Sequence, residues 1–303
     1  MPPITIIGCG YVGTRLALQI HQEAPSLLGV VQSESSARHL QDLGISALPL
    51  DMDTSPSPAV DGHRVFYFAP PAPTGHSDPR IGHWLHSLAR QKPAKIVLIS
   101  TTGVYGDCGG RWITEAAPVN PQTDRACRRV DAERQLRHWC DTRQIPYAIL
   151  RVPGIYGPYR LPRARLERRL PVLVEAESPF SNRIHVDDLV RACLAAASRD
   201  FTGVVHVSDG HPSTMTDYFN RVADALGLPR PEQISAKQAQ QILSREMLSY
   251  LAESKRMDIT RMRTVLGVEP DYADLERGLS DCVRSEKRSE RNGTDLSPKP
   301  PLP

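Results

Sequence analysis

Several features that mark specialised protein classes are missing from this sequence. Six cysteines are spread along 303 residues without a CxxC pair, so we expect reduced, mostly buried thiols and no zinc site. No stretch reaches the ~18 apolar residues that a membrane span requires. The first residues show neither a basic region nor a cleavage site, which favours a cytoplasmic protein with no membrane partner.

An excess of charge of one sign is also missing. The formal net charge of +3 is too small to indicate a nucleic-acid partner, because a phosphate-binding surface needs a concentrated basic face. Hydrophobic residues make up 40% and charged residues 23% of the chain, which is ordinary for a globular protein. The length fits either one large α/β domain or a domain with a smaller cap.

The first two thirds of the chain alternate short apolar runs with amphipathic stretches. This pattern is typical of βαβ units, and the near-continuous apolarity of the runs predicts a doubly wound parallel sheet of the Rossmann type, covered on both faces. The predicted strands are Ile4–Ile7, Leu27–Val31, Ala47–Leu50, Val65–Ala69, Ile96–Ser100 and Ala148–Val152. The predicted helices between them are Thr14–Gln22, Ser36–Leu43, Ile81–Arg90 and Thr123–Thr142.

The strongest binding motif is a GxGxxG pattern formed by Gly8, Gly10 and Gly13. It lies directly after an apolar strand and directly before a helical run, which is where a dinucleotide-binding turn needs it. Glycine there permits the tight turn and the close approach of the backbone to a pyrophosphate at the helix N-terminus. Tyr11 and Val12, between the glycines, join the predicted cofactor contacts, although a glycine-rich turn without a ligand is the alternative.

The end of the second strand bears on the form of the dinucleotide. An acidic residue is expected there in NAD-binding proteins, but Gln32 and Ser33 hold the position without charge. Arg38 is suited to a 2′-phosphate, so NADP is favoured and NAD is kept as the alternative. Glu34 is contrary evidence, because a shift of one or two residues would make it the ribose ligand.

Three further residues complete the predicted cofactor contacts. Asp51 follows the third strand, where it would meet the adenine edge or, equally, serve as an ordinary turn aspartate. Ala69 ends the fourth predicted strand and Pro70 follows it, at the edge of the sheet where ligands of doubly wound folds bind.

Three segments resemble the extended short-chain dehydrogenase/reductase family, in particular its epimerase-like branch. Ile99–Gly106 (ISTTGVYG) is similar to the end of the family's fifth strand, and Leu150–Pro158 (LRVPGIYGP) to its strand leading into the substrate loop. Asn182–Leu189 (NRIHVDDL) is similar to a late motif that opens a cap helix. The resemblance runs from Ile4 to about Leu279 and implies NAD(P) binding together with activity on a carbonyl, hydroxyl or nucleotide-sugar-like substrate.

The resemblance also implies a catalytic set in which this chain departs from the family. The family's Ser/Thr hydroxyl aligns with Thr101, with Thr102 as its neighbour, but Arg125 and Arg129 stand where the YxxxK motif would place tyrosine and lysine. Arginine stays protonated, so Arg125 can polarise an oxyanion but cannot shuttle a proton. Arg129 can retain the lysine's contact to the nicotinamide ribose, since that contact needs only a donor.

Two tyrosines are candidates to replace the missing acid/base group. Tyr105 and Tyr156 both follow strands at their carboxyl ends, although packing of the loop is the more common role for such residues. Arg160 and Arg183 are the charged residues that we expect near the substrate. Other arginines crowd the same segment as Arg160 and indicate either an anionic ligand or a solvated helix face: Arg163, Arg165, Arg168 and Arg169.

Two pairs of residues are interpreted as structural. His83 and His86 lie three apart on a predicted helix, but no third ligand is near in sequence, so we expect a surface pair and no metal site. Asp187 and Asp188 sit at the start of a predicted helix and favour its dipole.

We divide the chain into three parts on this basis. Residues 1–153 form the predicted NAD(P)-binding Rossmann domain, and residues 154–285 a small substrate-binding cap interleaved with the last sheet elements. Residues 286–303, charged and then proline-rich, are predicted to be a disordered tail. Within the second part we predict helices at Val186–Ala197, Met215–Leu226 and Lys237–Leu251 and a strand at Val204–Val207.

Two functions follow from these observations. The first is an oxidoreductase or epimerase with an altered active site that acts on a small molecule, which is anionic if the arginines bind it. Such a protein would form a homodimer through the helix at 123–142, as its relatives commonly do. The second is a non-catalytic NADP(H)-binding sensor or regulator on the same fold, for which the loss of tyrosine and lysine has no cost. The loop after Gly154 and the segment Asn182–Leu189, which face the substrate in the family, still match it. A sensor would have less need of them, so the enzyme is favoured.

Overall fold

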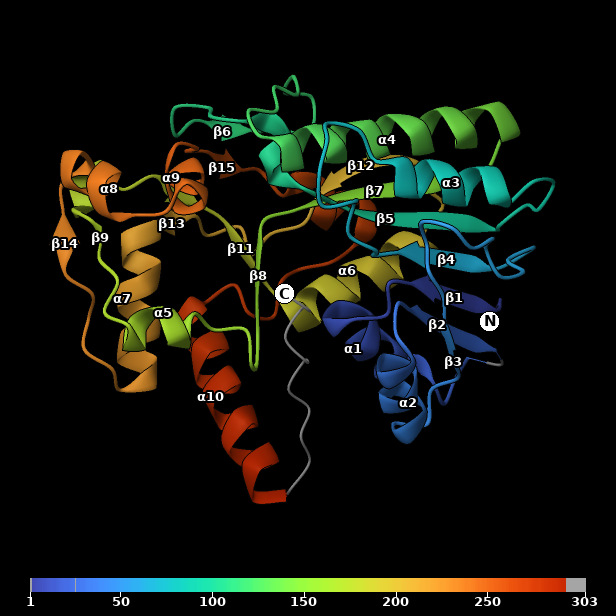
Figure 1. Ribbon diagram of the computed structural model, residues 1–303, viewed down its shortest axis with the longest axis horizontal. Helices are drawn as coiled ribbons and strands as arrows, with labels where there is room; N and C mark the ends of the chain where they lie inside the picture. The colour runs from blue at the N-terminus through green and yellow to red at the C-terminus, as the bar shows by residue number, and fades with distance from the viewer. Residues whose placement is uncertain (1, 25, 293–303) are drawn as a thin grey trace.

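A seven-stranded parallel sheet forms the centre of the computed structural model, which describes residues 2–24 and 26–292. Its strand order is β12-β7-β5-β4-β1-β2-β3, and the direction of winding reverses between β1 and β4 (Figure 1). The predicted Rossmann-type class is therefore confirmed. The strands are β1 (Ile4–Ile7), β2 (Leu27–Val31), β3 (Ala47–Pro49), β4 (Arg64–Tyr67), β5 (Lys95–Thr101), β7 (Tyr147–Val152) and β12 (Gly203–His206).

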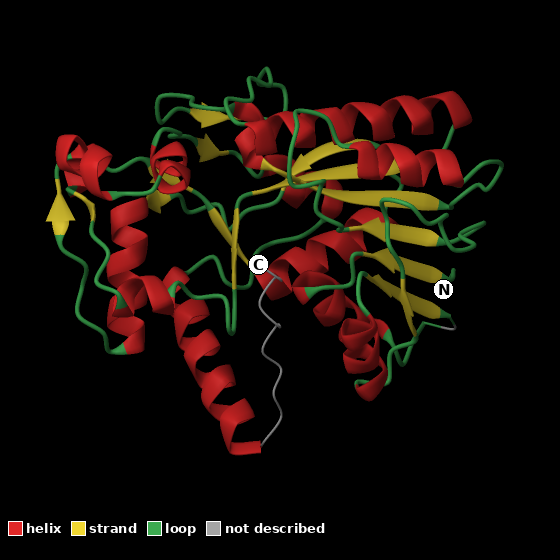
Figure 2. Ribbon diagram, in the orientation of Figure 1, coloured by secondary structure: helices red, strands yellow, loops and turns green. Residues whose placement is uncertain are grey.

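Helices cover both faces of this sheet (Figure 2). Successive side chains of β1 point to opposite faces of the sheet, and both faces are apolar. Ile6 packs toward Leu16 and Leu189 on one face, while Ile7 packs toward Trp84 on the other. The helices of the first face are α1 (Tyr11–Ile20), α2 (Glu34–Asp42) and α6 (Val186–Ser198). Those of the second face are α3 (Pro79–Ser87) and α4 (Asp124–Arg143).

The remaining elements form a cap beside the carboxyl ends of the strands (Figure 1). Four short strand pairs belong to it or join it to the sheet domain: β8 (Gly154–Tyr156) with β11 (Arg183–His185), β9 (Val172–Leu173) with β14 (Gln233–Ile234), β10 (Phe180–Ser181) with β13 (Ser213–Thr214), and β6 (Trp112–Ile113) with β15 (Arg256–Met257). Its helices are α5 (Arg163–Glu167), α7 (Met215–Leu226), α8 (Ala236–Ile242), α9 (Arg245–Leu251) and α10 (Leu275–Asn292). Shorter helical turns are η1 (Thr102–Tyr105), η2 (Glu175–Glu177) and η3 (Met262–Leu266).

Two of the departures from the sequence-based helix boundaries have a clear physical reason. Helix α1 begins at Tyr11 and not at residue 14, because Gly10 is its N-cap and the motif's last residues are already helical. The helix predicted at 237–251 is two helices, since the Ser244 hydroxyl accepts a hydrogen bond from the Met247 amide and starts α9 separately.

The expected tail differs as well. Residues 286–292 continue α10, where the Glu286 carboxylate accepts a hydrogen bond from the Tyr159 amide at 2.6 Å and pairs with Arg163. These tertiary partners hold a stretch whose charged composition alone favoured disorder. Residues 293–303 lie outside the described residues. Among the helices that are described, none combines the length and apolarity needed to cross a membrane.

Candidate functional site

The three glycines of the first turn occupy three different environments. Gly8 has φ +82°, and a Cβ there would collide with the Ala69 backbone. A Cβ at Gly13 would lie 3.0 Å from the Ile6 side chain, so this glycine allows close packing of helix on strand. A Cβ on Gly10 would meet nothing within 4 Å, so the backbone there borders open space. These are the properties that a pyrophosphate-binding turn requires.

Helix α1 points its N-terminus into a cleft of about 490 Å³ beside this turn. No side chain caps the helix, and its first turn carries no acidic residue. The amide groups of Tyr11, Val12 and Gly13 therefore have no partner within the helix, and the positive end of the helix dipole faces the cleft. The cleft is lined by Gly8, Gly10, Tyr11, Val12, Gly13, Gln32, Ser36, Pro70, Arg129, Ile155 and Arg160, among others. A dinucleotide diphosphate fits this donor set.

The second strand brings only part of its predicted set to the cleft. Gln32 lines it, whereas the Ser33 hydroxyl accepts from the Ser36 amide at 3.2 Å and caps α2. Glu34 and Arg38 are on α2 and do not line the cleft.

Of the three predicted contacts after the third and fourth strands, Asp51, Ala69 and Pro70, only Pro70 lines the cleft. Asp51 accepts hydrogen bonds from the Asp53 amide and the Thr54 hydroxyl, which makes it a turn aspartate and not a cleft residue. Ala69 is buried, and its backbone packs directly against Gly8 of the glycine turn. Pro70 lines the cleft directly.

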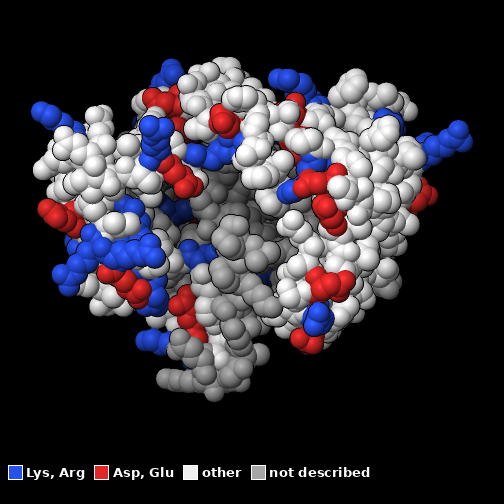
Figure 3. All heavy atoms as spheres, in the orientation of Figure 1, with Lys and Arg blue, Asp and Glu red and all other residues white. Residues whose placement is uncertain are grey.

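A second cavity, of about 570 Å³, lies between the sheet and the cap. Figure 3 shows a hollow at this place with lysine and arginine atoms on its walls. Of the predicted residues, Thr101, Thr102, Arg125, Arg129, Tyr156 and Arg183 line this cavity. The Thr101 hydroxyl lies at the end of β5 and accepts from the Gly103 amide at 3.3 Å. Its proton is thus left to donate to a ligand in the cavity.

Arg129 is shared by the cleft and the cap cavity. Its Nη1 is buried without a hydrogen-bond partner among the described residues, and burial lowers the pKa of the guanidinium. The acidic side chain that offsets this effect is Asp78, whose Oδ2 is likewise buried and unpartnered in the described part of the chain, as is the neutral Tyr67 hydroxyl. A half-buried cation with one buried, unsatisfied donor at the junction of two cavities is suited to hold an electron-rich ligand atom.

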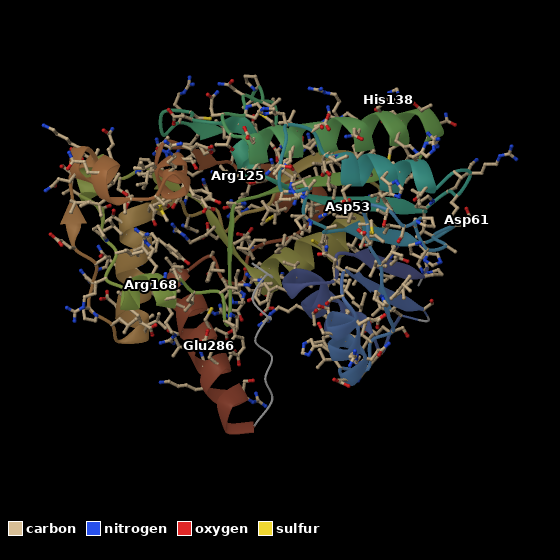
Figure 4. All side chains as sticks on the ribbon, in the orientation of Figure 1. Asp53, Asp61, Arg125, His138, Arg168 and Glu286 are labelled. Carbon is tan, nitrogen blue, oxygen red and sulfur yellow. The ribbon has the colours of Figure 1, made fainter. Side chains whose placement is uncertain are left out.

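Arg125 occupies the position of the family's tyrosine but points to the cap (Figure 4). Its Nη1 donates to the Ser249 hydroxyl at 3.0 Å, and its guanidinium lies 4.1 Å from the centre of the Tyr250 ring. Both partners belong to α9. Arg125 is therefore held by the cap, whereas Arg129 borders the cleft and the cavity.

Tyr105 does not line either cavity, which corrects its prediction as a substrate residue. Its hydroxyl is 2.5 Å from His206 Nε2 and accepts a hydrogen bond from Arg151 at 2.7 Å. Arg151 in turn forms a buried ion pair with Glu133, at 2.7 Å. The packing alternative therefore describes this residue. Tyr156, in contrast, lines the cap cavity with a buried hydroxyl that has no partner among the described residues.

The arginine-rich segment after Tyr156 does not reach the cap cavity. Arg160 lies beside the dinucleotide cleft, 4.8 Å from the Tyr11 ring, and not among the cap residues where we expected it. Arg163 pairs with Glu286, and Arg165 turns inward over Phe219. Arg168 and Arg169 are both exposed, and Figure 4 shows Arg168 on the cap near α5. The solvated alternative fits Arg163, Arg168 and Arg169 but not Arg160 or Arg165.

The other paired residues have structural partners. His83 Nε2 donates to the Ser55 carbonyl at 3.1 Å, and His86 is exposed, so the two do not converge on one point. The Asp188 carboxylate accepts from the Asp271 and Tyr272 amides at 2.9 Å and thereby anchors the cap to α6. Asp187 pairs with Arg15 of α1 at 2.7 Å.

Several cavity residues could not be identified by sequence reasoning because they belong to no motif. Tyr218 and Phe219 come from α7, Met247 and Tyr250 from α9, and Lys255 from the segment that follows. Lys255 pairs with Glu253 at 2.7 Å, so only the arginines remain without a carboxylate partner at the described cavity walls. The amphipathic pattern of these helices predicted burial but not which cavity they would border.

Comparisons with known proteins support the motif-based assignment. A sequence profile described as the NAD dependent epimerase/dehydratase family matches residues 61–207. A Streptomyces protein named 3-diazoavenalumate denitrifying reductase is 32% identical over 114 residues, which are 38% of this chain and 37% of that protein. The chain thus spans little more than a third of that relative. The resemblance to the extended short-chain dehydrogenase/reductase family is confirmed.

Two solved structures resemble nearly the whole chain. A functionally unknown conserved protein from Silicibacter pomeroyi DSS superposes with a TM-score of 0.83 at 26% identity, covering 94% of this chain and 99% of that one. MoeE5 in complex with UDP-glucose and NAD has a TM-score of 0.75 at 17% identity and covers 95% and 99% of the two chains. The second likeness shows the fold alone.

Proposed function

We propose that this extended short-chain dehydrogenase/reductase is an NAD(P)H-dependent reductase of a carbonyl-type substrate bound under the cap. The observation that carries the proposal is Arg129, a half-buried cation that lines both the dinucleotide cleft and the cap cavity and whose buried Nη1 has no partner among the described residues. A residue in this place can contact cofactor and substrate together. The MoeE5 complex, which holds a sugar nucleotide and NAD on the same fold, is consistent with that division of the site.

The cofactor part of the proposal rests on the glycine turn. The amides of Tyr11, Val12 and Gly13 would hold the diphosphate, and Gln32 and Pro70 would border the rest of the cleft. When bound, the dinucleotide supplies a hydride from its nicotinamide ring. NADP(H) is the form we favour, because Gln32 carries no charge to repel a 2′-phosphate and the cation of Arg38 lies one turn into α2.

The residues of the chain would assist the reaction by holding the substrate oxygen. The Thr101 hydroxyl donates to that oxygen, and the cation of Arg129 stabilises the negative charge that develops on it. Neither group is an acid that gives up its proton near neutral pH, so the proton comes from water in the cavity. An epimerase must remove and return a proton at an alcohol, and no tyrosine occupies position 125 to do so. Reduction is therefore favoured over epimerisation.

The sensor remains the second candidate, and one observation favours it. Arg125 is engaged with Ser249 and Tyr250 of the cap, so the former tyrosine position now joins two parts of the protein. A sensor must transmit dinucleotide binding from the sheet domain to the cap, and the contacts of Arg125 join these two parts. Such a protein needs no proton donor. Binding without turnover would distinguish this function from the reductase.

The deciding experiment follows dinucleotide binding and consumption separately. We expect purified protein to bind NADPH saturably by fluorescence and to oxidise it, as followed by its absorbance, with some members of a panel of aldehydes and ketones. Thr101→Ala is expected to leave NADPH affinity unchanged and to lower kcat about 100-fold, the usual effect of removing one oxyanion donor. Failure to bind any pyridine dinucleotide would refute the whole proposal, whereas binding with no turnover across the panel would select the sensor.

Arg125→Tyr tests the vacated position itself. A tyrosine there restores a proton donor on the same helix face as Arg129, so a carbonyl substrate should be reduced faster, and the pH profile of kcat should gain the ionisation of a tyrosine. The stability of the variant, measured by thermal unfolding, controls for the lost contact to α9. An inactive but folded variant would show that the arginine has a function of its own.

A further inference from the structure

Arg183 of β11 carries a buried positive charge at the cap end of the cavity. Its side chain is buried, with 4% of the residue exposed, and lines the cavity wall. Nη1 donates to the Ser213 hydroxyl at 2.8 Å, Nη2 donates to the Ser181 hydroxyl at 2.9 Å, and the cation lies 4.6 Å from the centre of the Tyr218 ring. All these partners are neutral. Two of the five N–H donors of the guanidinium are used in these bonds.

No carboxylate in the described part of the chain lies within ion-pair distance of Arg183. The nearest acidic influence is Asp209, whose Oδ1 accepts from the His211 amide at 2.9 Å and whose Oδ2 is buried without a partner among the described residues. Burial raises the pKa of Asp209 to about 7, so at neutral pH this carboxyl neutralises Arg183 only in part. A buried cation is costly unless an anion compensates it, which leaves room for one from outside.

The cavity as a whole is cationic and aromatic. Its charged wall residues are three arginines without carboxylate partners and one Lys255–Glu253 pair. The surfaces between them are apolar and mainly aromatic or thioether side chains: Phe180, Met215, Tyr218, Phe219, Met247 and Tyr250. Such walls suit a flat, unsaturated molecule better than a sugar, whose hydroxyl groups need many polar partners.

We propose that Arg183 binds the carboxylate of the substrate and that the substrate is a small aromatic or unsaturated carboxylic acid with a reducible carbonyl group. The assignment of the carbonyl end rests on the proposed function, because it places that group at Thr101 and Arg129. The assignment of the carboxylate end rests on Arg183 alone. Ser181 and Ser213 each accept one hydrogen bond from the guanidinium, which lies over the Tyr218 ring, so three of its N–H groups are left for a carboxylate.

The test compares a charged probe with its uncharged match. 4-Formylcinnamate and its methyl ester are titrated into the protein by calorimetry, with NADP⁺ present so that no reduction occurs. We expect the acid to bind at least about tenfold tighter than the ester, which is what one charge-assisted hydrogen bond supplies. Arg183→Gln is expected to abolish this preference, and Arg183→Lys to retain part of it. Arg168→Gln, an arginine exposed on the outside of the cap, is the matched control.

The pH dependence of acid binding gives an independent readout. Asp209 is faced by Arg183 of β11, Tyr156 of β8, Asp188 of α6 and its neighbours Ser208 and His211. A carboxylate on Arg183 disfavours ionisation of Asp209, so acid affinity should fall as pH rises through about 7. Asp209→Asn should flatten that profile while leaving ester binding unchanged. A merely structural Arg183 would not produce this difference.

Three results would overturn the proposal. Acid and ester binding equally well to the wild type would show that no carboxylate site exists. Equal loss of both ligands in Arg183→Gln, with an unchanged melting temperature, would make the residue a packing element. Binding of UDP-glucose that depends on Arg183, with no binding of the acid, would assign a nucleotide sugar. The reductase proposal fails separately, through absence of NADPH oxidation, because calorimetric binding of the acid requires no turnover.

Discussion

Gly8, Gly10 and Gly13 belong to one motif, but the physical reason for glycine differs between these positions. At Gly8 the constraint is internal, since φ is +82° and a side chain would strike the Ala69 backbone. At Gly10 no described atom lies within 4 Å of the position that a Cβ would take, so a side chain there would contact only a bound ligand. The motif can therefore be separated into a folding part and a binding part.

This separation predicts opposite phenotypes for two alanine variants. Gly8→Ala should lower the free energy of unfolding by more than about 1 kcal/mol, because alanine does not tolerate that φ and its Cβ has no space. Gly10→Ala should leave stability unchanged but weaken NADPH binding at least about tenfold, because its methyl enters the space in front of α1. Urea unfolding and fluorescence titration measure the two effects. Equal behaviour of both variants would contradict the separation.

Among the secondary structure elements, a buried polar network ties the sheet to α4. Ser100 of β5 and Arg151 of β7 both hydrogen bond to Glu133 of α4, and Arg151 continues through Tyr105 to His206 of β12. This network fixes the end of β5 next to Thr101. The orientation of the candidate site thus depends on residues that line neither cavity.

Removing one side of the ion pair should be more harmful than removing both. Arg151→Met leaves Glu133 buried without its cation and should cost about 3–5 kcal/mol of stability. The double variant Arg151→Met with Glu133→Gln should recover part of that loss, because no buried charge remains uncompensated. Urea unfolding of the wild type, both single variants and the double variant gives the coupling energy. A double variant no more stable than Arg151→Met would show that the pair acts through packing.

The contact between α4 and α9 leads to a prediction about mobility. Arg125→Ala removes the hydrogen bond to Ser249 and the stacking on Tyr250, so α9 loses its connection to the sheet domain at this point. We expect faster amide hydrogen exchange in residues 245–251 and an unchanged rate in α7. Thr142→Ala, at the opposite end of α4, serves as the control. Unchanged exchange in α9 would show that other contacts position it.

For the molecule as a whole, buried histidines link stability to pH. Burial lowers the pKa of His206 from its usual value of 6.5, so the unfolded chain binds a proton there more readily than the folded one. The stability that neutral His206 contributes is present above pH 6.5 and is lost as the pH falls below it. The slope from this residue alone is about 1.4 kcal/mol per pH unit. His206→Gln should remove that slope when urea unfolding is repeated from slightly alkaline to mildly acidic pH.

Association between copies of the chain is a second property of the whole molecule. Pairing through α4, which the family resemblance implies, remains a prediction. The accessible side of this helix carries charged residues such as Arg134 and Arg137 and not an apolar stripe. Light scattering after size exclusion would measure the oligomeric state, and Arg134→Glu should weaken a dimer that uses this side. An unaltered dimer would place the interface elsewhere.

The sheet, its order of elements and the dinucleotide turn could all be predicted from the amino-acid sequence. Each of these depends on spacing between residues that are near one another in the chain: apolar runs of strand length, a glycine pattern between strand and helix, and hydroxyls at the end of β5. Local sterics and hydrogen bonding restrict such segments to few conformations. The positions of Gly8, Gly10, Thr101 and Arg129 at the cleft or the cavity could therefore be predicted from the sequence alone, while their roles stay predictions.

Which polar side chains face the cavities depends instead on the folded chain. Tyr105 and Tyr156 follow strands in similar sequences, yet one is held in the core by Arg151 and His206 and the other borders the cap cavity. The same holds for Arg160 and Arg183, which were both predicted to lie near the substrate, although Arg160 borders the dinucleotide cleft and Arg183 the cap cavity. The direction of a long side chain depends on partners from distant segments, and those partners meet only once the cap has folded onto the sheet.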